Sequence, residues 1–279
     1  MKLKTDVFPL NYVKNIWSPL KAFKNRFVLT WPMMIVVIIF LNALMVIPVT
    51  LNYAEMESFP LEEYYPIAAS QLVDDQVLDE IQTVVVNEGQ LSIPEPFQVE
   101  NAYGEVVGGL SLDEIENHIS SPNFIAFQEN QLIIAEEGLP TATVLYTRDV
   151  SFGEMETKEE IVEEISRQWF NQNRVLIVLI FSFLISTFLL FMLLFLVFGS
   201  SFLLYLTKKG SLTTIKTYKE SVNLILNSLA VPTFLAMLFG LFYFELYIMV
   251  TIQSLGMAAY LFWIWYKVQF NDQRLSNLT

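Results

Sequence analysis

The chain has no cysteine, a single histidine, and only 10 glycines and 11 prolines among its 279 residues. Without cysteine there is no disulfide and no thiolate ligand or nucleophile. The one histidine, His118, has no second histidine or cysteine with which to hold a metal ion. A Gly-x-Ser-x-Gly turn and a Gly-Lys-Ser/Thr phosphate loop are also missing from the sequence. We therefore expect no catalytic residues, no cofactor and no metal, and predict that the protein is not an enzyme.

Charge is nearly absent from three long stretches, residues 27–53, 175–206 and 221–266. A helix needs about 20 apolar residues to cross a bilayer, and the third stretch is long enough for two helices joined by a turn near 243–245. The sequence thus predicts an α-helical integral membrane protein with four transmembrane helices, at 27–53, 175–206, 221–244 and 245–266. A single helix over 175–206 would be about 48 Å long, which exceeds the hydrocarbon core, so a break near Gly199 is expected.

Basic residues are scarce between the first two apolar stretches. Of the 16 lysines and arginines, six lie in 1–26, four in 207–220, two in 267–279, and only four in 54–174. Lysine and arginine collect on the cytoplasmic side of membrane proteins. This bias places both termini and the 207–220 loop in the cytoplasm of a multi-pass cell-membrane protein, and residues 54–174 outside. Four spans agree with two ends on the same side.

The predicted outer segment, 54–174, carries 25 of the 29 acidic residues. Such a charge repels nucleic acid and other polyanions, so nucleic acid is not an expected partner. Neutral glycans, cationic ligands and other proteins remain open. About 120 residues are enough for one hydrophobic core, which must be held together by packing alone. The acidic run 154–164 lacks the alternating oxygen ligands and central glycine of a calcium loop, so a solvated helix face is the favoured interpretation.

The outer segment reads as an extracytoplasmic α+β domain. Val73, Val77 and Ile81 mark one helix, followed by a β-rich run at 83–86. Serine or threonine three residues before glutamate is typical of a helix start, and apolar residues follow each such pair at helical intervals. Segments rich in β-branched and aromatic residues predict a small antiparallel sheet, with 101–109 as a hairpin of the same sheet. The helix-start pairs are Ser111 with Glu114 and Thr157 with Glu160, and the strand segments are 123–128, 131–136 and 141–147. The helix from 157 is expected to continue into the second apolar stretch.

The first 26 residues form a basic, amphipathic segment. Ser18-Pro19 is a suitable cap and first-turn pair for restarting a helix. A helix with aromatic residues on one side and lysines on the others is typical of a segment lying in the membrane interface. The apolar positions are Val13, Ile16, Trp17, Leu20, Phe23 and Phe27. An interfacial anchor for the first span is the preferred interpretation, ahead of a regulatory lipid sensor.

Within the apolar stretches, Asn223, Asn227 and Pro232 are the most notable residues. The two asparagines are four apart and share a helix face, while Pro232 removes a backbone hydrogen bond and frees the carbonyl of Ser228. Since no ionisable group lies at depth, an ion path through this chain is disfavoured. Hydrogen bonds between helices are the stronger interpretation of these polar side chains. If a partner surface exists in the membrane, it is predicted at these three residues.

Several short motifs carry a family resemblance. The start Trp17-Ser18-Pro19 is followed by one span, an outer domain and three clustered spans, and a Tyr218-Lys219 entry precedes the run Leu229–Thr233. With the strand pair Phe124–Phe127 and Leu132–Ile134, this layout resembles the maltodextrin-utilisation-associated membrane proteins of Gram-positive bacteria. The resemblance implies sugar-transport components as neighbours in the bilayer. It implies no activity and no catalytic residues.

The sequence favours one function and leaves one alternative. The first is a non-enzymatic accessory or sensory membrane protein that binds partners, linked to maltodextrin or other carbohydrate uptake. The alternative is a transmission subunit of an ABC-type complex that couples a cytoplasmic ATPase to an extracellular cell-wall hydrolase, since those proteins share the order of one span, an outer domain and three spans. The short basic segment 207–220 disfavours the alternative, because it lacks the coupling helix expected there. The sequence sets no oligomeric state.

Overall fold

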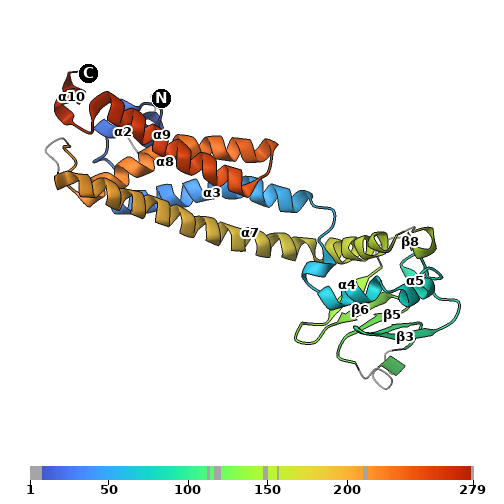
Figure 1. Cartoon of the computed structure of the whole chain (residues 1–279). Helices are drawn as coiled ribbons and strands as arrows, with labels where there is room; N and C mark the ends of the chain where they lie inside the picture. The colour runs from blue at the N-terminus through green and yellow to red at the C-terminus, as the bar shows by residue number, and fades with distance from the viewer. Residues whose placement is uncertain are drawn as a thin grey trace. The chain divides into compact units, whose positions relative to one another are not determined.

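The computed structural model describes residues 8–111, 114–115, 121–146, 150–155, 157–209 and 213–277. The chain divides into two compact units. We call Met1–Glu55 with Val178–Thr279 the helical unit, and Met56–Ile177 the α+β unit. Figure 1 shows the long helices of the first and the strands and short helices of the second.

The α+β unit is built on a five-stranded sheet of order β3-β4-β5-β6-β7. Neighbouring strands are antiparallel except β4 and β5, which are parallel. Val107, Ala126 and Ile133 are aligned across three strands, and Ile115 packs with them. The strands are β3 Phe97–Asn101, β4 Gly104–Gly108, β5 Phe124–Phe127, β6 Gln131–Ala135 and β7 Ala142–Leu145. Because β4, β5 and β6 are buried along consecutive residues, both faces of the sheet centre are covered.

A second sheet and several short helices complete this unit. The second sheet has three antiparallel strands in the order β2-β1-β8, which are Gln90–Ser92, Val85–Asn87 and Val150–Ser151. The short helices are η1 Leu61–Glu63, α4 Pro66–Leu72, α5 Asp75–Ile81 and η2 Phe152–Glu154. Helices α4 and α5 pack against β3, β4 and β5. The helix predicted at Val73, Val77 and Ile81 is α5, in which Val77 and Ile81 are buried. It begins after Val73, because Val73 ends α4 and Asp74 caps α5 with its side chain on the Gln76 amide.

The structure tests the remaining predictions for this unit one by one. The three strands over 123–147 belong to the five-stranded sheet. A hairpin of the same sheet also forms, but it consists of β3 and β4 and covers 97–108, so 101–109 holds only its turn and second strand. The sheet is not wholly antiparallel as predicted, because β4 and β5 are parallel. Thr157 caps the following helix through the Glu160 amide, and Ile161, Ile165 and Trp169 are buried as the periodicity predicted. The Glu114 carboxylate accepts from the Ser111 amide and hydroxyl, which confirms that capping pair. Most of the helix that would follow it lies outside the described residues.

Glu136 connects the sheet to α4, and its replacement gives a first testable prediction. Its buried carboxylate accepts hydrogen bonds from the Ile67 and Ala68 amides, at 3.0 and 3.2 Å, in the first turn of α4. A negative charge there also complements the helix dipole. We expect Glu136→Ala to weaken local stability by about 1–2 kcal/mol, seen as roughly 5- to 30-fold faster hydrogen exchange in a peptide covering 66–72. Exposed Glu137→Ala is the control, and equal exchange in both variants would contradict the capping role.

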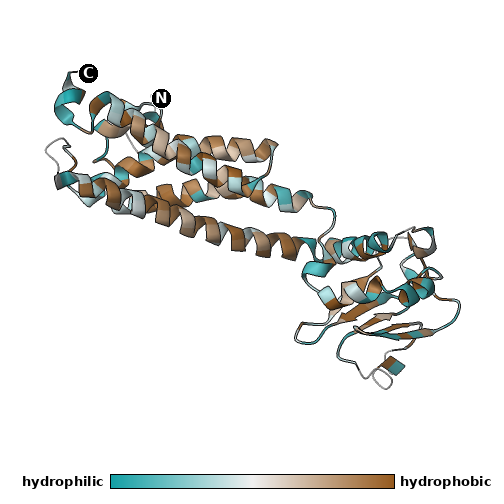
Figure 2. Cartoon of the chain, in the orientation of Figure 1, coloured by the Kyte–Doolittle hydropathy of each residue, from teal (hydrophilic) through white to brown (hydrophobic). Residues whose placement is uncertain are grey.

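Among the residues that the structure describes, four helices are long and apolar enough, by length and composition, to cross a membrane. They are α3 Trp31–Glu55, α7 Lys158–Leu206, α8 Tyr218–Phe242 and α9 Leu246–Val268. Three lie in the helical unit, and the fourth, α7, begins in the α+β unit and continues into the helical unit. Figure 2 shows hydrophobic residues along α3, α8, α9 and the later part of α7, whereas the first turns of α7 are hydrophilic. The turn between α8 and α9 lies at 243–245, as predicted.

Helix α7 corrects one prediction and confirms another. It runs unbroken for 49 residues, so the helix from 157 does continue into the second apolar stretch. The predicted break near Gly199 is wrong, because α7 continues to Leu206 and ends in the 3-10 turn η3 Thr207–Lys209. The Ser201 hydroxyl donates to the Val197 carbonyl without interrupting the helix. One glycine among good helix formers weakens a helix without ending it.

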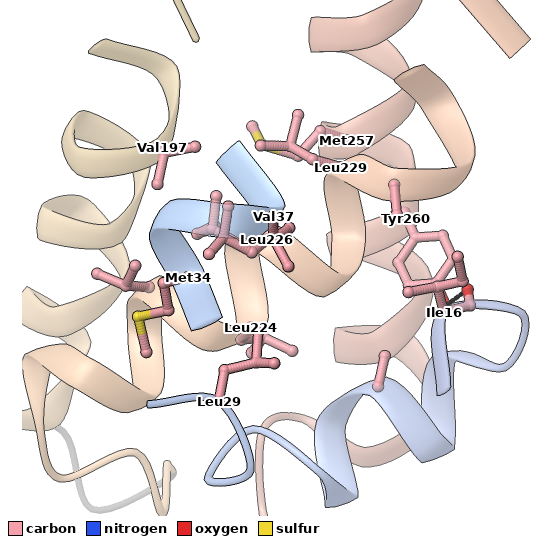
Figure 3. Packing of buried hydrophobic residues seen from close by; sticks show 14 of the residues in the cluster. Ile16, Leu29, Met34, Val37, Val197, Leu224, Leu226, Leu229, Met257 and Tyr260 are labelled. Carbon is pink, nitrogen blue, oxygen red and sulfur yellow. Dashed lines mark hydrogen bonds between the residues drawn. The ribbon is translucent and has the colours of Figure 1, made fainter. Parts of the chain in front are cut away.

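The N-terminal segment packs onto α8 and α9. It forms α1 Leu10–Ile16 and α2 Pro19–Lys24, with Ser18-Pro19 as the restart that the sequence predicted. The Tyr12 hydroxyl donates to the Leu226 carbonyl at 2.9 Å, and the Tyr260 hydroxyl to the Ile16 carbonyl at 2.6 Å. Figure 3 shows this second bond and the apolar side chains around Leu226 and Leu229. The apolar positions of the predicted amphipathic segment therefore differ in burial. Ile16 and Phe23 are buried, whereas Val13, Trp17 and Phe27 are exposed.

Candidate functional site

Asn223 and Asn227 lie on α8 and join it to the N-terminal segment. The Asn223 side chain accepts from the Leu29 amide at 3.0 Å and donates to the Leu29 carbonyl at 3.1 Å. Asn227 donates to the Ala22 carbonyl at 3.1 Å. These contacts bear out the interpretation of the asparagines as hydrogen-bonding links between segments. Asn223 thus pairs with backbone groups of an irregular stretch, at Leu29, whereas Asn227 bonds a carbonyl of α2.

Pro232 is also internal. It faces α9, where a Cβ added to Gly256 would come within 2.7 Å of the Pro232 Cβ, so the glycine permits this close approach. Helix α8 runs through Pro232 without ending. Asn223, Asn227 and Pro232 are all buried inside the chain. In the single chain these side chains contact residues of the same chain, and the predicted partner surface at these three residues stays a prediction.

A buried arginine, Arg26, pairs with two carboxylates in the helical unit. Arg26, only 1% exposed, donates two parallel hydrogen bonds to the Asp272 carboxylate, at 3.0 and 2.8 Å. Its Nε lies 3.4 Å from the Glu220 carboxylate. The guanidinium also lies over the rings of Phe23 and Phe27, at 4.2 and 4.3 Å from their centroids. We call these five residues with Thr214 the Arg26 cluster.

The sequence explains how each part of the Arg26 cluster is held. Thr217 and Glu220 form a reciprocal capping box at the start of α8, which fixes the Glu220 carboxylate. After α9 the chain reverses through Gln269 and Phe270, which have φ values of 50° and 54°. This left-handed conformation costs about 1 kcal/mol or more for each non-glycine residue. The Thr214 amide donates to the Phe270 carbonyl at 2.8 Å and holds the reversal, which brings α10 Asp272–Ser276 beside Arg26.

The Arg26 cluster binds together four segments that are distant in sequence: the end of α2, the segment before α8, the first turn of α8 and the C-terminal tail. Arginine suits this role, because its planar fork meets one carboxylate with two bonds while its faces stack on aromatic rings. The cluster therefore closes one end of the helical unit. Its geometry is that of a structural clasp.

Asp272 makes the clasp sensitive to acid. Burial by itself raises the pKa of Asp272, but hydrogen bonds from Arg26 and Thr214 and the charges of Arg26 and Lys216 outweigh it and hold the pKa below the usual value of 3.8. A lowered pKa in the folded state means that the ion pair stabilises the fold above pH 3.8 and that this contribution is lost as the pH falls through the lowered value.

We therefore expect Asp272→Asn to lower the melting temperature at pH 7. The gap to the unaltered chain should stay constant down to about pH 5 and shrink below the usual aspartate pKa, since both chains then lack the negative charge. Melting curves of the full chain in detergent between pH 7 and pH 3 measure this gap. A gap that is already absent at pH 7 would show that the pair does not stabilise the fold.

Sequence reasoning missed the Arg26 cluster. Arg26 was counted only as one of six basic residues of the N-terminal segment, and Asp272 lies 246 residues away. One signal was present: Thr217-x-x-Glu220 has capping-box spacing and places a carboxylate at the edge of an apolar stretch. The pairing with Arg26 and Asp272 follows only from the packing of α1 and α2 on α8 and α9.

The α+β unit carries an open groove of about 600 Å³ between η1, α4 and the first turns of α7. Its wall includes the carboxylates of Glu62, Glu159 and Glu163, and Glu163 also pairs with Arg167 at 3.0 Å. An acidic wall of this kind disfavours anions and leaves neutral or cationic ligands open. Among the described residues no group of three or more potential metal ligands occurs. His118 lies outside the described residues.

These features define a class of protein: an α-helical chain with four helices long and apolar enough to cross a membrane, and a separate α+β unit with a small sheet. Comparison with known proteins identifies the family. It is 30% identical over 266 residues to the maltodextrose utilization protein MalA of Streptococcus pneumoniae, covering 95% of this chain and 97% of the relative. The chain therefore belongs to the maltodextrin utilization protein family of Gram-positive bacteria, as the sequence motifs predicted.

A second relative extends the family to another genus. The chain is 23% identical over 280 residues to the putative maltodextrin utilization protein YvdJ of Bacillus subtilis, covering 92% of this chain and 88% of the relative. No family model matches the sequence. No solved structure matches it either.

Proposed function

We propose that this protein is a non-enzymatic, multi-pass membrane protein that binds partner proteins in maltodextrin uptake. The observation that carries the proposal is the full-length similarity to a relative named for maltodextrose utilization. The four long apolar helices support the membrane placement. The absence of recognisable catalytic motifs in the sequence supports a binding role over an enzymatic one.

The proposed topology has both termini in the cytoplasm and residues 54–174 outside. It is supported by the separation of charge, because 25 of 29 acidic residues lie in 54–174 and 12 of 16 basic residues lie in the proposed cytoplasmic segments. The Arg26 cluster then closes the cytoplasmic end of the helices. The acidic groove lies in the extracellular part, where it meets neutral sugars, cationic ligands or the extracellular face of a transport component.

The missing cysteines make the topology directly testable. We expect Tyr103→Cys, at the exposed β3–β4 turn, to react with a membrane-impermeant maleimide in intact cells. Ser276→Cys, exposed at the end of α10, is expected to react only after permeabilisation. The unaltered chain has no cysteine and provides the background. Labelling of Ser276→Cys in intact cells at the level of Tyr103→Cys would contradict the topology.

The function itself is tested by in-cell crosslinking, affinity purification and identification of the proteins that co-purify. Recovery of sugar-transport components would support the proposal, and a strain lacking the protein should then grow more slowly on maltodextrin but normally on glucose. Recovery of a cytoplasmic ATPase together with a cell-wall hydrolase would overturn it in favour of a transmission subunit. Normal growth on both sugars would contradict the link to maltodextrin.

A further inference from the structure

The apolar part of α7 has two opposite faces. One is turned toward the rest of the helical unit, where Leu189, Leu193 and Val197 are buried and Ser186 accepts a hydrogen bond from Asn42. The other face carries five phenylalanines at alternating spacings of three and four residues, which is the spacing of a helix–helix seam. We call them the phenylalanine seam: Phe188, Phe191, Phe195, Phe198 and Phe202.

The phenylalanine seam is uncovered in the single chain. Its members are between 37% and 81% exposed. Of the 18 most apolar consecutive residues of α7, only 11% are buried, whereas 28% to 67% of the corresponding residues are buried in the other three long helices. At roughly 200 Å² for each ring, the seam exposes about 600 Å². Covering it on two copies buries up to about 1,200 Å², which is the lower end of the range for specific interfaces.

Gly199 borders the phenylalanine seam, four residues after Phe195 and three before Phe202. Nothing in the chain requires glycine there, because an added Cβ would meet no atom within 4 Å. Glycine in a helix interior weakens the helix, so its presence at this open position is unexplained within one chain. In membranes, small residues let a neighbouring helix approach closely. We call the space left by the missing side chain at Gly199 the notch. Fluid lipid tails do not require such a space.

We propose that two copies of this chain associate in the membrane through the phenylalanine seam, with the notch at Gly199 receiving a side chain of the other copy. A second copy fits because the seam repeats one residue type, so that a two-fold axis sets ring against ring. Association in hydrocarbon depends on such packing contacts, since burial of apolar surface there has no driving force of its own. Aromatic rings gain from offset and edge-to-face contact. The inference rests on the proposed membrane placement.

The cysteine-free chain allows a direct test by crosslinking in native membranes. Phe188→Cys and Phe195→Cys are placed one at a time on the seam, and Phe183→Cys is the matched control. Phe183 lies on the same helix and is 71% exposed, but at 3.6 residues per turn it points about 120° away from Phe195. A bifunctional maleimide should yield a species of twice the monomer mass from both seam variants, at least fivefold more than from Phe183→Cys.

Gly199→Leu provides the second arm. Its Cβ would meet no atom within 4 Å in the monomer, and leucine is a better helix former than glycine, so the single chain should fold normally. Combined with Phe195→Cys, it is expected to lower the crosslinked fraction severalfold, because it fills the notch. An unchanged fraction would overturn the role of the notch, and the Gly199→Leu chain must appear in the membrane fraction at the usual level.

The other outcomes are equally decisive. The association would be overturned if the seam variants are present in the membrane fraction but crosslink no more than Phe183→Cys. The phenylalanine seam would then contact lipid. A crosslinked species whose mass differs from twice the monomer would overturn the second copy in favour of another partner helix. A chain absent from the membrane fraction would instead contradict the proposed membrane placement itself, so the two failures are distinguished.

Discussion

Replacement of Arg26 by methionine is expected to destabilise the helical unit by about 3–5 kcal/mol. Methionine retains most of the contact with Phe23 and Phe27 but removes the charge between the Glu220 and Asp272 carboxylates. Glu220 is 6% exposed, so its charge is then buried without compensation. Thermal unfolding of the purified full-length chain in detergent measures the effect as a lower melting temperature.

Two companion variants separate the ion pair from a general loss of positive charge. Lys24→Met, on the exposed side of α2, removes the same charge and should leave the melting temperature nearly unchanged. Adding Glu220→Gln to Arg26→Met should restore part of the loss, because it removes the uncompensated charge while an amide can still cap α8. If Lys24→Met and Arg26→Met melt alike, the clasp does not contribute to stability.

Asn223→Leu is expected to cost about 3 kcal/mol, and clearly more than Asn227→Leu. Leucine is similar in volume, but it leaves both the amide and the carbonyl of Leu29 without their partner in a buried place. Asn227→Leu leaves only the Ala22 carbonyl unpaired. Melting of the two variants in detergent, side by side, tests the ranking.

Asn223→Asp refines this prediction, because it keeps the acceptor for the Leu29 amide and loses the donors to Leu29 and Lys219. An intermediate loss is expected if both directions of the exchange matter. Should Asn227→Leu prove as damaging as Asn223→Leu, the paired contact with Leu29 would not be the stronger link. Both substitutions act on folding, so a growth defect on maltodextrin should follow the loss of folded protein.

Local sequence signals predicted many elements because they depend on residues close in the chain. Thr157 and Ser18-Pro19 mark helix starts through groups within one turn, and the strands over 123–147 follow from β-branched residues and the turns between them. The prediction failed at Gly199, where one glycine was given more weight than the good helix formers around it. It also placed the start of α5 too early, at Val73, because the Asp74 cap was not recognised.

The sequence by itself determined the four apolar helices, the acidic α+β segment and the family, because hydrophobic length, charge distribution and short motifs are all local or additive properties. Only the tertiary structure decided how the polar residues are used. The Arg26–Asp272 pair, the Asn223–Leu29 exchange and the parallel pairing of β4 with β5 join residues far apart in the chain. A buried charge or amide takes whichever partner the packing of α1 and α2 on α8 and α9 brings within hydrogen-bonding distance, and no local pattern in the sequence specifies that partner.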